Sequence, residues 1–259
     1  MNDEFETVLY NVERGVGRLT LNRPDRMNGM TNRMVRETHE ALQLAAADDS
    51  LRVLVLTGAG TSFCPGADLG HFTEGGADER LSPEHFRATT LLHEMPAVTV
   101  AAINGACAGA GLGWACACDL RLATRSAKLN TAFLAVAVAG DMGLPWTLAH
   151  LVGAAKAREL SFLPGKIDAA EAERIGLVTR VFDDDEFASR VEDVVERLAS
   201  SAPLALRTLK SNYLAAERLG FADYIDLEAD RHLRVASSPE TAEAFRAFVE
   251  KRTPDFGRR

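Results

Sequence analysis

The chain has 259 residues, of which 47% are hydrophobic and 25% charged, and its formal net charge is −8. Such a length and composition are typical of an ordinary soluble globular protein with one large domain, or one domain and an appendage. The acidic balance argues against a nucleic-acid binder, which needs a basic face. We therefore predict no nucleic-acid partner.

The one long uncharged stretch is not a convincing membrane span. Met95–Cys118 is long enough to cross a bilayer, but Pro96 and the Asn104-Gly105 pair interrupt it and its many Ala and Gly residues make it weakly hydrophobic. The acidic first six residues also lack the basic region of a signal peptide. We interpret the four cysteines (64, 107, 116 and 118) as reduced core thiols of a cytoplasmic protein, without a metal site.

The first part of the chain predicts a mixed α/β order. Strands are expected at Thr7–Val12, Val16–Asn22 and Leu51–Thr57, and helices at Thr31–Ala47, with Thr31 as N-cap, and at about Ser82–Glu94. Between them, residues 58–69 form an ordered loop and Gly70–Asp78 a glycine-rich, polar and mobile one. Gly58 and Gly60 do not indicate a dinucleotide site, because the third glycine and the helix of that motif are missing.

The central stretch, Val98–Ala123, combines a buried strand with a run of small residues. The apolar run Val98–Ile103 predicts the strand, and Gly109–Ala117 a tightly packed helix before another short strand at Asp119–Arg121. A helix N-terminus at Gly109–Gly111 presents unpaired N–H groups and the positive end of its dipole, which suits a developing oxyanion. The alternative is close packing of helix on sheet with no ligand.

After the central stretch the pattern is mixed, and from Asp185 onward it is purely helical. We first expect a short strand near Lys128-Leu129, helices at Leu144–Leu151, Ala154–Phe162 and Ala169–Ile175, and a strand at Leu177–Val181. Helices at Glu186–Ala199, Pro203–Ala216, Phe221–Ala236 and Pro239–Lys251 follow. We divide the chain into a core of residues 1–200 and a helical region of residues 201–259. The tail is rich in apolar residues that its own body or a neighbouring subunit would bury.

Four ordered segments resemble the crotonase family, also called the enoyl-CoA hydratase/isomerase superfamily. They are LNRPDRMN at residues 21–28, GTSFCPGADL at 60–69, the glycine-rich segment 101–120 and the helices of 151–181. The match covers essentially the whole chain. It implies an α/β fold built as a spiral of ββα units with a C-terminal helical region, assembled as a homotrimer or a dimer of trimers.

The resemblance also implies an acyl-CoA substrate, with coenzyme A as part of the substrate and no separate cofactor. Family enzymes hold the thioester carbonyl oxygen between two backbone N–H groups, which map here to Ala67 and Ala110, with Gly111 as the adjacent alternative. Two fixed donors where enolate charge develops stabilise the transition state by several kcal/mol. Other residues expected at the substrate are Arg26, Pro65, Gly66, Asp68, Leu69, Gly109 and Phe133.

The chain departs from the family's hydratases. Their two glutamates, which position and activate water, correspond to Gly113 and Phe133, and neither residue can move a proton. One acid remains, Asp141, at a position where several isomerases of the family carry a catalytic acid. Amid Phe133, Val136, Met142 and Trp146 its pKa should rise toward the range of a general base. The alternative is that Asp141 caps a helix that begins near Met142.

We therefore predict an acyl-CoA isomerase with Asp141 as base. The alternatives are an enzyme with Asp141 as nucleophile, like the family's 4-chlorobenzoyl-CoA dehalogenases, and a CoA-binding protein without catalysis. Asp68 is read as a loop-bracing residue, and Trp146 as a core residue. His85 is a weaker candidate for the acyl pocket, His93 is weaker still, and Arg26, Lys251 and Arg252 are candidates for CoA phosphates.

Overall fold

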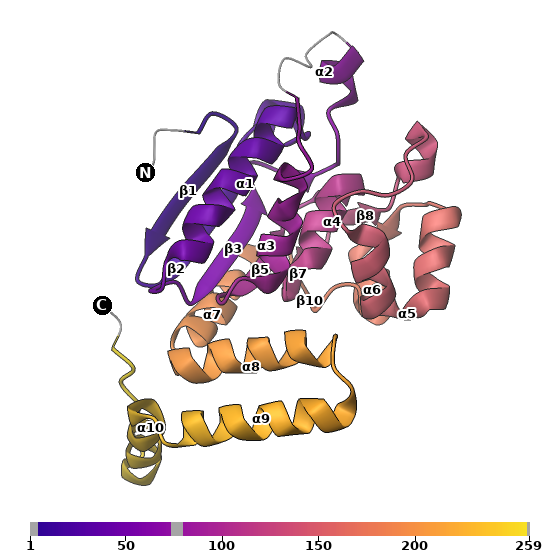
Figure 1. The fold of residues 1–259 in the computed structure, drawn as a ribbon. Coiled ribbons are helices and arrows are strands. Elements are labelled where there is room, and N and C mark those ends of the chain that lie inside the picture. Colours follow the sequence, from indigo (N-terminus) through magenta and orange to yellow (C-terminus); the bar gives the residue numbers. More distant parts are fainter. Residues whose placement is uncertain (1–4, 74–79, 258–259) are drawn as a thin grey trace.

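The computed structural model describes residues 5–73 and 80–257, and it contains two sheets surrounded by helices (Figure 1). The larger sheet has the order β1 (Val8–Glu13), β2 (Val16–Leu21), β3 (Val53–Gly58), β5 (Val98–Ile103), β7 (Leu120–Thr124) and β10 (Arg180–Phe182). The smaller one has the order β4 (Ser62–Cys64), β6 (Ala106–Ala108), β8 (Lys128–Asn130) and β9 (Ile167–Asp168). Among the described strands, β1–β2 and β8–β9 are the antiparallel pairs.

Successive strand pairs give the chain its spiral course. The pairs β3–β4, β5–β6 and β7–β8 each place their first strand in the larger sheet and their second in the smaller one. Within each sheet these strands lie parallel to one another, so every turn of the spiral advances by one strand. The helices of the body are α1 (Asn32–Ala47), α2 (Leu69–Thr73), α3 (Ala88–Glu94), α4 (Gly109–Ala117), α5 (Leu144–Phe162), α6 (Ala169–Arg174) and α7 (Phe187–Ala199).

The inner strands of the larger sheet are buried on both faces, which is why most of their residues are apolar. All six residues of β5 are buried. On one face the main core includes side chains of α1 and α4, and on the other Val191, Val195 and Ala199 of α7 pack on Val53 and Val100. Helix α1 begins as predicted, because the Thr31 hydroxyl accepts a hydrogen bond from the Met34 N–H at 3.2 Å.

Several predicted elements have different bounds in the structure. The helix expected at Ser82–Glu94 becomes a 3₁₀ turn at His85–Arg87 and then α3, because the Ser82 N–H donates to Nδ1 of His85 beside Pro83. The strand expected at Leu177–Val181 is shifted, since Leu177 and Val178 donate to the Ala172 carbonyl in the turn that ends α6.

Three further expectations concern loops and helix breaks. The three-residue strands β4 and β6 lie where the sequence indicated only loop or turn. Residues 70–73 of the predicted mobile loop belong to α2, and its residues 74–78 lie outside the described residues. The predicted break between two helices near residue 153 is confirmed, because Gly153 interrupts α5 with φ 78° and ψ 155°.

The C-terminal helices are α8 (Pro203–Ala216), α9 (Phe221–Ala236) and α10 (Pro239–Glu250). Helices α8 and α9 lie side by side below the body, and α10 lies beyond the C-terminal end of α9 (Figure 1). The three end within one residue of their predicted bounds. Within the described ranges, no helix has the length and apolar character that crossing a membrane requires. The four cysteines, all in the described part of the chain, are unpaired and buried as expected.

Candidate active site

The loop Pro65–Leu69 is held in an extended conformation beside Met30. The Met30 N–H donates to the Gly66 carbonyl at 2.8 Å, and the Asp68 N–H donates to the Met30 carbonyl at 2.9 Å. Neighbouring N–H groups of extended backbone point to opposite sides. The Ala67 N–H is therefore directed away from Met30, and it has no acceptor within residues 5–73 and 80–257.

Two side chains fix this loop to the loop of residues 22–28. The Arg23 guanidinium donates to Asp68 Oδ2 at 2.9 Å, and the His71 N–H donates to Asp68 Oδ1 at 3.0 Å. Partial burial opposes the charge of Asp68, but the bonds from His71 and Arg23 prevail and lower the pKa of its carboxyl. Asp68 is thus the loop-bracing residue that was predicted, anchored by a hydrogen bond from a backbone N–H and by an ion pair.

Asn28 is a second brace, and sequence reasoning gave it no role of its own. Its side chain is fully buried and donates to the carbonyls of Ala59 and Ser62 at 2.9 and 2.7 Å, while its Oδ1 accepts from the Arg23 N–H. Asn28 also has a positive φ of 61°, which Asn tolerates better than most residues. An Asn among turn residues was the available signal.

The N-terminus of α4 meets this loop directly. A methyl group on Gly66 would lie 3.2 Å from the Ala108 carbonyl oxygen and 3.6 Å from Gly109 Cα. Gly66 and Gly109 also have positive φ angles of 100° and 52°, so the backbone favours glycine at both points, and at Gly66 space favours it as well. The close approach places Ala67 and Ala110 on neighbouring backbone segments.

The Ala110 N–H belongs to the first turn of α4, whose N–H groups have no partners within the helix. Within the described chain no side chain caps this helix, and no backbone acceptor lies at Ala110. The adjacent Gly111 is packed on β4, because a Cβ atom there would lie 2.3 Å from the Cys64 carbonyl oxygen. The sequence-predicted pair Ala67 and Ala110 is therefore brought together, with both donors unpaired.

Asp141 lies in a tight turn before α5. Gly140, Met142 and Gly143 have φ angles of 112°, 44° and 68°, an unusual run that only the two glycines adopt without strain. The Met142 N–H donates to Asp141 Oδ1 at 2.7 Å. Burial raises the pKa of the Asp141 carboxyl, although that hydrogen bond lowers it.

Asp141 does not cap α5. The helix begins at Leu144 with Gly143 as N-cap, and within the described residues no side chain caps it. The Asp141 carboxylate binds Met142 instead, two residues before the helix. The capping alternative is therefore wrong in its geometry, and the carboxylate is free for another role.

Gly113 brings the Asp141 turn against α4. A Cβ atom on Gly113 would lie 2.7 Å from Met142 Cβ and 3.1 Å from the Asp141 carbonyl oxygen. Gly113 and Ala110 are three residues apart and share one face of the helix. The Asp141 turn therefore lies about one helical turn from the Ala110 N–H, on the same side of α4.

Phe133 closes the other side of this region. Its Cε1 atom would lie 3.9 Å from a Cβ on Gly109. The ring also lines an apolar cavity of about 400 Å³ between the 3₁₀ turn Phe133–Val136 and α5. The remaining lining residues are Leu134, Val138, Ala139, Gly140, Pro145, Ala149, Ala154, Ala157, Arg158, Ser161 and Phe162. The space beside the turn is thus mostly apolar.

The weaker candidates fall outside this cluster. His85 packs edge-on against His39 of α1 at 5.9 Å between ring centroids. His93 contacts Glu217 of α8 at 3.0 Å. The expectation that Trp146 is a core residue is wrong: 47% of it is exposed, and it stacks on His150 at 3.9 Å. It lies on the outer side of α5, where the helix meets α3 and α8.

The cations proposed for CoA phosphates are on the surface. Arg26 ends the 3₁₀ turn Pro24–Arg26 and is exposed, beside the loop that Arg23 braces. Lys251 is the C-cap of α10, and Arg252 is held by Glu243 and Glu250. Pro65 and Leu69 flank Ala67 in the bracing loop, half-buried and exposed respectively. In the described ranges, no three His, Cys, Asp or Glu side chains are placed to hold a metal ion.

Comparison with known proteins identifies the family to which this geometry belongs. Residues 11–259 match the model of the enoyl-CoA hydratase/isomerase family. The chain belongs to this family. A 1,2-epoxyphenylacetyl-CoA isomerase of Escherichia coli is 34% identical over 97% of this chain and 98% of its own length. A 4-chlorobenzoyl coenzyme A dehalogenase of an Arthrobacter species is 36% identical over 76% of this chain and 74% of its own.

A solved structure of the same family has the same fold. A putative enoyl-CoA hydratase/isomerase from Mycobacterium abscessus superposes with a TM-score of 0.89 at 34% identity, covering 97% of this chain and all of that one. The predicted crotonase fold is therefore confirmed. The protein is an acyl-CoA enzyme of the hydratase/isomerase family, whose names include both isomerases and hydratases.

Proposed function

We propose that the enzyme shifts the double bond of an enoyl-CoA, with Asp141 as the base. The proposal has three supports: a half-buried carboxyl with a raised pKa, two unpaired N–H groups about one helical turn away, and residues without acidic groups at 113 and 133. The first of these carries it. A carboxylate whose pKa lies above its ordinary value is a better proton acceptor at neutral pH.

In the proposed reaction the thioester carbonyl oxygen lies between the N–H groups of Ala67 and Ala110. Asp141 takes a proton from C2 of a 3-enoyl thioester, and the electron pair delocalises into a dienolate whose oxygen both N–H groups stabilise. Asp141 then returns the proton at C4, which leaves a 2-enoyl thioester. The reaction involves no net oxidation or reduction, so it needs no redox cofactor, and coenzyme A serves only as part of the substrate.

The apolar cavity beside Phe133 is our candidate for the acyl group. Its volume of about 400 Å³ is in the usual range for a small-molecule site. Pro65, Gly66, Asp68 and Leu69, together with Gly109 and Gly111, shape the backbone around the thioester, and exposed Arg26 is the candidate for a CoA phosphate. The four free, buried cysteines support a cytoplasmic enzyme.

The reaction is tested by incubating the enzyme with a 3-enoyl-CoA and following the 2-enoyl product, with crotonyl-CoA hydration as the parallel assay. We expect isomerisation with little or no hydration, because the positions of both hydratase glutamates lack an acid. Asp141→Asn should lower kcat by about 10²-fold or more while acyl-CoA binding, measured by calorimetry, stays nearly unchanged. Asp68→Asn is the control: it should perturb the loop and weaken binding without abolishing proton transfer.

Three results would contradict the proposal. Brisk hydration of crotonyl-CoA by the native enzyme would show that water is activated by groups other than the missing glutamates. Wild-type turnover in Asp141→Asn would show that another residue moves the proton. Binding of acyl-CoA without turnover of any member of a substrate panel would favour a CoA-binding protein without catalysis.

The second candidate keeps the site and makes Asp141 a nucleophile. It is favoured by the similarity to the Arthrobacter dehalogenase, which is 36% identical over the 206 matched residues. There the carboxylate would attack the ring carbon, halide would leave with its electron pair, and water would hydrolyse the aryl ester. Mass spectrometry of the enzyme after mixing with a halobenzoyl-CoA distinguishes the two, because only the nucleophile forms a covalent aryl adduct.

A further inference from the structure

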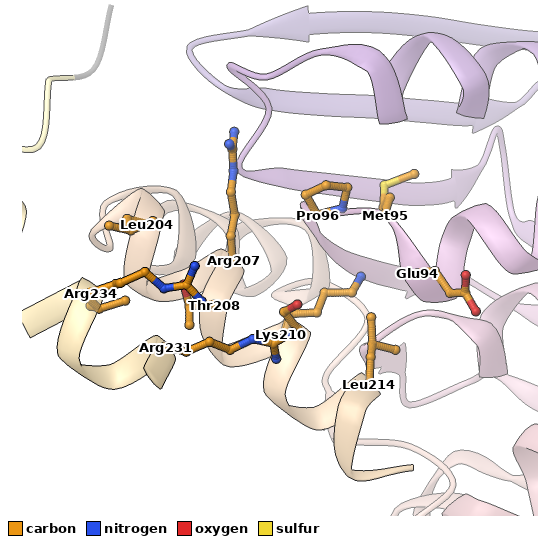
Figure 2. Close-up of a pocket in the computed structure, with 12 residues that line it drawn as sticks. Glu94, Met95, Pro96, Leu204, Arg207, Thr208, Lys210, Leu214, Arg231 and Arg234 are labelled. Atoms are coloured by element: carbon orange, nitrogen blue, oxygen red, sulfur yellow. The ribbon is translucent and has the colours of Figure 1, made fainter. Parts of the chain in front are cut away.

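A second cavity lies between the C-terminal helices and the body. It has a volume of about 370 Å³ and shares no residue with the candidate active site. It forms where α8 and α9 meet the end of α3 and the start of β5 (Figure 2). Its lining residues are Glu94, Met95, Pro96, Leu204, Arg207, Thr208, Lys210, Ser211, Leu214, Arg231, Arg234 and Val235.

The charge of this cavity is opposite to that of the protein. Arg207, Lys210, Arg231 and Arg234 line it, against the single carboxylate of Glu94, in a chain whose net charge is −8. Figure 2 shows Arg207 rising from α8 toward the body, while Arg231 and Arg234 reach from α9 toward α8. Like charges gathered in one concavity repel one another, so the arrangement favours a bound anion.

Two of the four cations are already neutralised by carboxylates of the chain. Lys210 Nζ lies 2.8 Å from Asp119 Oδ2, and Arg234 Nη2 lies 2.8 Å from Asp230 Oδ2. The one acid of the cavity, Glu94, is likewise paired, with Arg218 outside it. These pairs leave the positive charges of Arg207 and Arg231 uncompensated.

The guanidiniums of Arg207 and Arg231 have only neutral partners among residues 5–73 and 80–257. Arg231 Nη1 donates to the Asn212 amide oxygen at 2.9 Å, and Arg207 Nη2 donates to the carbonyls of Asp49 and Leu51. Arg207 Nε is buried and has no hydrogen-bond partner in the described part of the chain. A buried donor without an acceptor is uncommon in folded proteins, so the described chain does not fully satisfy this guanidinium.

We propose that this cavity binds the phosphate group of a small soluble metabolite, independently of the activity proposed above. Two uncompensated guanidinium charges match a phosphate monoester, which carries nearly two negative charges at neutral pH. The hydroxyl groups of Thr208 and Ser211 line the same cavity and can donate to the remaining phosphate oxygens. A volume of about 370 Å³ leaves room for a small organic group beyond the phosphate.

The charge of the cavity matches a phosphate better than a carboxylate. A carboxylate carries one negative charge and would leave one guanidinium uncompensated. Binding of a phosphate monoester should therefore strengthen as its phosphate group takes the second negative charge, near pH 6. Because the cavity joins α8 and α9 to the body, the ligand would also strengthen the attachment of the C-terminal helices.

The test uses the full-length protein and inorganic phosphate, titrated by calorimetry at constant ionic strength, with acetate and chloride as comparison anions. We expect saturable binding of about one phosphate per chain and much weaker binding of acetate. Arg231→Gln should weaken phosphate binding by about tenfold or more. Arg246→Gln is the matched control, because Arg246 is an exposed arginine of α10 outside the cavity, and it should bind like the wild type.

Three outcomes would overturn the proposal: no phosphate binding, equal binding of acetate, or equal losses in the Arg231 and Arg246 variants, which would indicate a general ionic effect. If Arg231→Gln does not fold, Thr208→Val takes its place, since it removes one donor with little change in volume. Binding that is unchanged in Thr208→Val would then contradict the site. Arg207→Gln is avoided, because Arg207 also holds the backbone of residues 49–51.

Discussion

At the scale of single residues, the packing around Gly113 leaves no room for a glutamate side chain at that position. The Asp141 turn occupies the space that a side chain at 113 would need, with Met142 Cβ at 2.7 Å and the Asp141 carbonyl oxygen at 3.1 Å. A glutamate could enter only if this turn moved away from α4, and Asp141 would move with it. The absence of a side chain at position 113 therefore allows the Asp141 turn to pack against α4.

The raised pKa of Asp141 has a consequence for stability. A carboxyl whose pKa is raised by folding stabilises the native state below its unfolded pKa, about 3.9, and that contribution is lost as the pH rises through the folded pKa. At neutral pH the half-buried carboxylate is therefore a cost. Asp141→Asn should raise Tm at pH 7, and the gain over wild type should shrink as the pH falls toward 4.

Thermal unfolding of both proteins from pH 8 to pH 4 measures this difference. Asp193→Asn, which changes an exposed carboxylate of α7, is the control and should give a small shift that does not follow this pattern. A Tm of Asp141→Asn that is lower than wild type at pH 7 would contradict the inference that the carboxylate is desolvated. The same raised pKa predicts that activity is lost on acidification at a higher pH than an ordinary aspartate would give.

At the scale of elements, what could be predicted from sequence followed from local signals. The bounds of α8 and α9 were predicted because Pro203 starts one, Gly220 precedes the other, and apolar residues recur at helical spacing. The strands β4 and β6 were missed because three residues are too few for a period, and only the parallel neighbours of the spiral make them strands. Trp146 was misplaced because one of its ring partners, His93, lies on another helix that is far away in sequence.

The residues of the candidate site also differ in whether the sequence could predict them. Ala67, Ala110 and Asp141 were predicted through the resemblance to the family, and the small residues at 109–111 independently supported one of them, Ala110. The residues that hold the Ala67 loop, Arg23 and Asn28, act through a carboxylate and a carbonyl more than thirty residues away. No local pattern encodes such contacts, since they depend on how the loops of successive turns meet.

Helix α8 is attached to the body by one buried ion pair. Lys210 is 6% exposed, and its Nζ donates to Asp119 at 2.8 Å and to the Ala97 carbonyl at 2.9 Å. Asp119 in turn accepts from Thr99, whose N–H lies at 2.7 Å. Lys210→Met should lower the free energy of unfolding by about 2–4 kcal/mol, because it leaves that carbonyl and carboxylate without their buried donor.

Urea denaturation of Lys210→Met checks this value. The control is Lys156→Met, since Lys156 pairs with Glu159 on the surface of α5 and its loss should change the free energy of unfolding by less than about 1 kcal/mol. Equal effects of the two substitutions would show that the Lys210 pair contributes no more than an exposed one. A loss of stability confined to Lys210→Met would show that the ion pair with Asp119 holds α8 to the body.

At the scale of the whole molecule, the C-terminal helices present more apolar surface than a monomer usually leaves to water. Phe221, Leu233, Phe245, Phe248 and Val249 are each between 69% and 85% exposed. A second apolar region lies on the body, where Phe162 and Leu163 at the end of α5 are 67% and 77% exposed. Exposed apolar areas of this kind mark interaction surfaces. We propose that copies of the chain cover them in a homotrimer or a dimer of trimers.

Light scattering coupled to size exclusion tests the assembly, because one chain has a mass of 28.0 kDa. We expect three or six times that mass at micromolar concentration. Phe248→Glu places a charge on a side chain that is 85% exposed in one copy, so it should shift the mass toward that of a single chain. Leu44→Glu changes a 48% exposed residue of α1, away from both apolar regions, and should leave the mass unchanged. A wild-type mass of 28.0 kDa would show that the chain is a monomer whose apolar residues are exposed to water, and the assembly proposal would be wrong. The role proposed for Asp141 does not depend on this result.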